Sequence, residues 1–109
     1  MELTGIQQDI RNELMQAQAA LADGNAGKAR VCARRAVGKA FQLSRYSKEI
    51  GRLVSANGSL KIIAGMAQLP VEVRKAAERL SASVLEEGIS QKPVEDALVI
   101  IVQLLEISQ

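Results

Sequence analysis

Residues 24–41 of this 109-residue chain, GNAGKARVCARRAVGKAF, open a long segment rich in alanine, lysine and arginine. Its apolar residues recur every three or four positions, as they do in a helix with one buried face. We expect the helix to begin near Asn25 or Ala26 and to bury a stripe made of Ala29, Cys32, Ala33, Ala36, Ala40 and Leu43. Small side chains in such a stripe let helix axes approach closely. The segment therefore predicts a closely packed helical fold.

The sequence leaves the far end of this helix open. The helix either breaks near Ser44 or continues through Ile50 and Val54. Gly38 lies off the predicted buried stripe, where it lowers helix propensity by about 1 kcal/mol relative to alanine.

Three further helices are expected before residue 90. The first covers residues 3–21, capped by Thr4 and ended by Asp23-Gly24-Asn25. Asn57-Gly58-Ser59 is interpreted as a helix end followed by an N-cap at Ser59, which gives a short helix at 60–68. Pro70 suits the first turn of the next helix, which we expect to close at 86–88 and to bury Val73, Ala77, Leu80 and Val84.

Pro93 opens the last expected helix, which runs to Leu105 and is apolar nearly all round. A helix of this kind lies centrally in a core or shares its surface with a dimer interface. The interface residues would be Leu98, Ile101, Val102 and Leu105. The β-branched run at 99–102 is also compatible with a strand.

These segments predict an all-α, four- or five-helix up-and-down bundle, formed by two helical hairpins in a single domain over residues 1–109. Leu21-Ala-Asp-Gly24 and Leu85-Glu-Glu-Gly88 resemble each other, and each is expected to end one helix and lead into another. Two copies are too few for a repeat solenoid.

Composition predicts a cytoplasmic protein without a membrane segment. No apolar run approaches the length of roughly 20 residues that a membrane-spanning helix needs, and the acidic N-terminus does not resemble a secretory signal. The single Cys32 can form no disulfide within the chain, and we expect it to be a small core residue. The core must be aliphatic, because Phe41 and Tyr46 are the only aromatic residues.

The chain has no histidine, and therefore lacks the usual general base and metal ligand. Glu86-Glu87 and Glu95-Asp96 are adjacent acids that point apart on a helix, so we interpret them as solvated acids at helix ends. Gly24-Asn-Ala-Gly27-Lys28 departs from the P-loop pattern, and its G-x-x-G lacks the sheet of a KH domain, so a turn between helices is favoured. We expect no catalytic residue, metal site or cofactor.

Eight of the 14 Lys and Arg residues lie between positions 28 and 52, with one acid, whereas the rest of the chain has six basic and eleven acidic residues. On a continuous helix Arg30, Arg34, Arg45, Lys48 and Arg52 would share one narrow sector with Phe41. This surface either pairs with acids of the first and last helices, binds nucleic-acid phosphates, or docks an acidic protein. Its candidate binding residues are Arg30, Arg34, Arg35, Lys39 and Arg45.

The pattern Leu14-x-x-Ala17 … Leu21-x-x-Gly24-Asn25 … Ala29-x-x-x-Ala33-Arg34-Arg35-Ala36-Val37-Gly38-Lys39-Ala40 resembles the front half of HEPN domains. The resemblance implies a dimeric helical scaffold with an RNA- or partner-binding role. The histidine of the nuclease members has no counterpart in this chain, so cleavage is not implied. A single tetratricopeptide-like hairpin would show a similar alanine pattern.

These observations predict a non-catalytic helical protein-interaction module that forms a homodimer through apolar helix faces. The alternative is an RNA-binding component of a HEPN-like two-component system that lacks nuclease activity.

Overall fold

The structure, a computed structural model, describes residues 5–51, 54–83, 86 and 88–106. In this part of the chain it contains helices and no strand, which confirms the all-α prediction. The elements are α1 (Gly5–Ala22), α2 (Ala26–Leu43), α3 (Arg45–Ile50), α4 (Ala56–Ala64), α5 (Val71–Ser81) and α6 (Pro93–Leu104). Thr4, Val84 and two residues of the predicted turn at 85–88, Leu85 and Glu87, lie outside the described residues.

The hairpin of α1 and α2 forms as predicted. Gly24 adopts a left-handed φ of 78°, and the N–H groups of Gly24 and Asn25 donate to the carbonyls of Leu21 and Ala20. This is the Schellman end of a helix. The Asn25 side chain then accepts the N–H of Lys28 at 3.0 Å and caps α2. Gly24 and Asn25 therefore form a turn between two helices, and Gly27 and Lys28 lie in the first turn of α2.

The buried stripe of α2 matches the prediction at every position except Leu43. Leu43 is 37% exposed, because it is the last residue of the helix. Ser44 is extended (ψ 159°), and its hydroxyl donates to the Phe41 carbonyl at 2.7 Å. The chain therefore breaks at Ser44 and forms the separate short helix α3, which brings the described helices to six rather than four or five.

The predicted start of α4 is wrong. Ser55, and not Ser59, is the N-cap, and its side chain accepts the Gly58 N–H at 3.0 Å. Asn57 and Gly58 consequently lie inside the first turn. Ser59 is buried in the helix, where its hydroxyl donates to the Ser55 carbonyl at 2.9 Å. A serine four residues earlier caps a helix that already contains the Asn-Gly pair, so this pair does not end a helix here.

Helix α5 follows Pro70 as predicted but ends at Ser81, before the expected 86–88. Helix α6 begins at Pro93 and is regular through the 99–102 run, so the strand alternative is wrong. Two turns of α6 bury Ile100 and Leu104 at 0% and 2% exposure.

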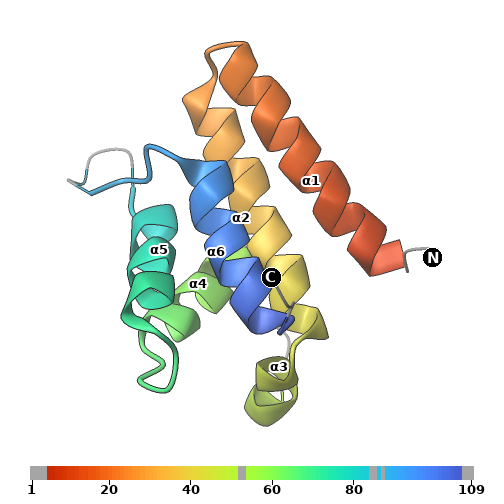
Figure 1. Cartoon of the computed structure of the whole chain (residues 1–109), viewed down its shortest axis with the longest axis vertical. Coiled ribbons are helices and arrows are strands. Elements are labelled where there is room, and N and C mark those ends of the chain that lie inside the picture. The colour runs from red at the N-terminus through yellow and green to blue at the C-terminus, as the bar shows by residue number, and fades with distance from the viewer. Residues whose placement is uncertain (1–4, 52–53, 84–85, 87, 107–109) are drawn as a thin grey trace.

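Helix α2 lies at the centre of this arrangement, and all five other described helices contact it. Figure 1 shows α1 along one side of α2 and α6 in front of it, with α4 and α5 on the opposite side from α1. Both aromatic residues are in the main core, Phe41 at 0% and Tyr46 at 5% exposure. No helix in the described residues is long and apolar enough to cross a membrane.

Gly38 is buried, although the sequence placed it off the packed stripe. A Cβ added at Gly38 would lie 3.0 Å from both Cα and Cβ of Ala56, the first residue of α4. The absence of a side chain therefore lets α4 begin directly against α2.

Replacing Gly38 tests this contact. We expect Gly38→Val to lower the free energy of unfolding by about 1–3 kcal/mol, because the added atoms overlap α4. Gly27→Ala is the matched control, since a Cβ there would meet only the Asn25 side chain at 3.8 Å. Urea unfolding followed by circular dichroism measures both variants, and a Gly38→Val protein as stable as the wild type would disprove the close approach.

Candidate functional site

Two of the five predicted binding residues, both arginines of α2, donate hydrogen bonds within the fold. Arg34 donates through Nε to the Leu80 carbonyl and through Nη2 to the Ala82 carbonyl at 3.0 Å. Arg30 donates through Nε to the Ser90 carbonyl at 2.8 Å. These carbonyls lie at the end of α5 and in the segment that follows it. Because the last carbonyls of a helix have no partner within it, Arg34 acts as a side-chain cap for α5.

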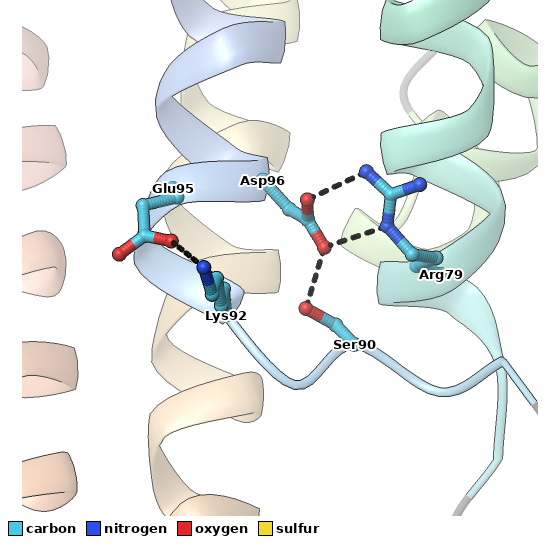
Figure 2. A network of polar contacts seen from close by, with 5 residues as sticks. All are labelled: Arg79, Ser90, Lys92, Glu95 and Asp96. Atoms are coloured by element: carbon cyan, nitrogen blue, oxygen red, sulfur yellow. Dashed lines mark hydrogen bonds and ion pairs between the residues drawn. The ribbon is translucent and has the colours of Figure 1, made fainter.

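The same region contains a buried polar network that sequence analysis missed. Arg79 on α5 donates to both carboxylate oxygens of Asp96 on α6, at 3.1 and 2.8 Å. The Ser90 hydroxyl donates to Asp96 Oδ2 at 2.6 Å, and the Ser90 N–H donates to the Arg79 carbonyl at 3.1 Å. Figure 2 shows the three side chains converging from α5, α6 and the intervening segment. The hydrogen bond to Asp96 raises the pKa of the Arg79 guanidinium above its ordinary value.

Asp96 is therefore not the solvated helix-end acid that the sequence suggested, because it is only 7% exposed. Its neighbour Glu95 does fit that interpretation. Glu95 is 68% exposed and forms only a loose pair with Lys92 at 3.9 Å. Adjacent positions on a helix point apart, so one acid enters the α5–α6 junction and the other faces solvent.

Arg35 and Lys39 occupy a different face of α2, next to α1. They line a shallow depression of about 330 Å³ together with Asp9, Glu13, Asn12 and Gln16 of α1. Two acidic groups thus stand beside two basic groups. Pairing with acids of the first helix, one of the alternatives from the sequence, therefore stays a prediction for Arg35 and Lys39, since neither forms an ion pair among the described residues.

Arg45 does not continue the α2 surface, because the chain breaks at Ser44. Its guanidinium lies 5.3 Å from the centre of the Tyr46 ring and 3.4 Å from the Glu106 carboxylate. The Tyr46 hydroxyl and Glu106 raise the pKa of Arg45. The break at Ser44 means that Arg45 and Lys48 do not continue the helix of Arg30 and Arg34, so these four do not form the predicted single sector, and Arg52 lies outside the described residues.

Apolar side chains form an open groove of about 330 Å³ between α1 and α6, which we call the α1–α6 groove. It is lined by Ile10 and Leu14 of α1, by Leu98, Ile101 and Leu105 of α6, and by the polar side chains of Gln7 and Arg11. The groove exists because α1 packs mainly on α2 and makes few contacts with α6. Figure 1 shows both helices lying along α2.

Three of the four predicted interface residues line this groove. Leu98 is 42% exposed, Leu105 is half-buried, and Ile101 is only 4% exposed. Val102 is half-buried and is outside the lining. Sequence analysis missed the wall formed by α1, because helical periodicity predicts which residues of α1 are apolar but not which neighbour covers them.

The remaining candidates for chemistry are few. Cys32 is 2% exposed in a small cluster with Ala17, Ala20, Ala29 and Val94, as expected of a core residue. Within the described residues, no three His, Cys, Asp or Glu side chains are grouped as metal ligands. Every buried side-chain nitrogen and oxygen in that part of the chain has a hydrogen-bond partner.

No protein-family model, curated protein or solved structure matches this chain. The resemblance of its first half to HEPN domains therefore stays a prediction. The class that the structure defines is an all-α helical bundle, and its function has to be argued from its own surfaces.

The two neighbouring arginines of α2 should differ in their effect on stability. We expect Arg34→Met to lower the free energy of unfolding by about 1.5–3 kcal/mol, because two carbonyls at the end of α5 lose a charged donor. Arg35→Met should change it by less than about 0.5 kcal/mol, as at most surface positions. Urea unfolding measures both, and equal effects would mean that the Arg34 contacts do not stabilise the fold.

The two neighbouring acids of α6 provide a second matched pair. Asp96→Asn should lower the free energy of unfolding by about 1–3 kcal/mol, because Arg79 loses its counter-charge and one charged acceptor. Glu95→Gln should change it by less than about 0.5 kcal/mol, since an exposed ion pair contributes little. Thermal and urea unfolding measure both variants. Equal losses of unfolding free energy in Asp96→Asn and Glu95→Gln would contradict a stabilising role for the network.

Proposed function

We propose that this chain is a non-catalytic helical protein-interaction module and that its docking surface is the α1–α6 groove. The main observation in support of this proposal is that the α1–α6 groove is apolar and open to solvent. Leu98 is 42% exposed there, and the floor is continuous with the core through Ile10 and Ile101. Burial of apolar area on association is favourable by about 25 cal/mol per Å², so such a groove favours a partner.

The walls of the groove suit a helix as the partner. Leu98, Ile101 and Leu105 follow one another at spacings of three and four residues along one side of α6. Amphipathic helices dock into grooves of this kind through anchors at the same spacings. Arg11 at the edge adds a positive group, which favours a partner helix with acidic flanks.

Binding of RNA is the alternative function, and the charges support it less well. Steep salt dependence requires several cations free to contact phosphates. Arg30 and Arg34 donate to backbone carbonyls, while Arg35 and Lys39 stand beside Asp9 and Glu13. A phosphate backbone would therefore meet two arginines that already use donors within the fold, and two basic groups that stand beside acids.

A labelled, designed amphipathic helix with a leucine stripe and glutamate flanks tests the docking surface. At nanomolar protein concentration we expect saturable binding that Leu98→Glu weakens at least tenfold, which is about 1.4 kcal/mol. Val31→Glu is the matched control, because Val31 is 40% exposed on another helix, α2.

The result that would overturn the proposal is an absence of binding, or equal loss in both variants. Labelled single-stranded RNA is measured in parallel. Salt-dependent RNA binding that Arg35→Glu/Lys39→Glu abolishes would favour the alternative. These two positions are suitable because, unlike Arg34, neither donates a hydrogen bond to the end of α5.

A further inference from the structure

We infer that the occupant of the α1–α6 groove is α6 of a second copy of this chain. The two copies would lie antiparallel about a twofold axis and form a four-helix bundle from two α1 and two α6 helices. This inference rests on the proposed docking function of the groove, and names the partner that it receives.

Helix α6 carries both halves of a self-complementary surface. Leu98, Ile101 and Leu105 form one wall of the groove, while Leu98 and Val99 are each 42% exposed and Val102 is half-buried. The same helix therefore offers an apolar wall to a partner and an apolar ridge that fits a partner's groove. A twofold interface requires this property, because each copy contributes the same residues.

The direction of the helices fixes which ends would meet. In Figure 1, α1 runs antiparallel to α6, so the first half of α1 lies beside the second half of α6. Arg11 belongs to this first half of α1, which lies toward the end of α6 that Leu105 follows. An α6 from the second copy that runs opposite to the resident α6 brings its first turn, with Glu95, to this end.

The charges at that end are complementary. In the described part of the chain, Arg11 forms no ion pair, and it is exposed at the edge of the groove. Glu95 is 68% exposed and is only 3.9 Å from Lys92 in a loose pair within the same helix. Glu95 is therefore free to face Arg11 of the other copy. Twofold symmetry would form this pair twice, which favours the antiparallel arrangement over a parallel one.

The composition of the monomer is consistent with this partner. The cluster that joins α1, α2 and α6 is built from Ala17, Ala20, Ala29, Cys32 and Val94. Small side chains remove little apolar surface from water, so α1 is held on α2 with modest burial. A second α6 packed on α1 would cover Leu14, which lines the groove and is only half-buried in a single copy.

Analytical ultracentrifugation over low to high micromolar concentrations tests the arrangement. We expect the wild type to be a dimer at the upper end, Leu98→Glu to be a monomer throughout, and Val31→Glu to behave as the wild type. Arg11→Glu and Glu95→Arg should each weaken the dimer about tenfold, because each places like charges together twice. The double variant Arg11→Glu/Glu95→Arg should return to within about threefold of the wild type. Circular dichroism verifies that each variant is folded, and all four substituted positions are exposed enough to tolerate the change.

The failures of the two proposals are distinguishable. A wild type that stays monomeric while the designed helix still binds the groove would overturn the second-copy inference and leave the docking function standing. A dimer that survives Leu98→Glu would also overturn it, because the interface would lie elsewhere. A double variant that does not recover would overturn the antiparallel arrangement. A monomer that fails to bind the designed helix would overturn both proposals.

Discussion

The close approach of helices to α2 is the constraint on which this structure depends. Every other described helix contacts α2, and its packed positions are mostly alanine, with Gly38 where α4 begins. Small side chains allow the neighbouring axes to come near from several directions. The same feature limits how much apolar surface each contact buries, so the bundle depends on additional polar contacts where its helices end.

Those polar contacts come from arginines. Arg34 and Arg30 reach from α2 to carbonyls at and after the end of α5, and Arg79 joins α5 to Asp96 of α6. Ser90 holds the intervening segment to the same carboxylate. A partly buried guanidinium has several donors in a fixed plane, which suits it to satisfying backbone and carboxylate oxygens together. Arg30 and Arg34, two of the predicted binding residues, therefore have a structural role, which reduces their weight as evidence for nucleic-acid binding.

The α1–α6 groove is a consequence of the same packing. Because α1 and α6 both pack along α2 but make few contacts with each other, the apolar side chains between them remain accessible. The core of the monomer thus continues into the lining of the groove through Ile10 and Ile101. A docking function for the groove and a second α6 as its occupant both follow from this geometry and from the exposure of Leu98.

The sequence by itself determined the all-α class, the α1–α2 turn at Gly24, the stripe of α2 and the start of α6, because these depend on local periodicity and on caps within a few residues. Tertiary structure decided the rest. Periodicity could not show that Asp96 is buried while Glu95 is exposed, or that Arg34 bonds to the end of α5 while Arg35 does not. These differences depend on which neighbouring helix faces each side chain. Phe41, on the same sector of α2 as Arg34, was the one sequence feature indicating that this side packs. The position of the groove also depended on tertiary structure. An apolar stripe predicts that one face of a helix is covered, but it does not predict which helix covers it.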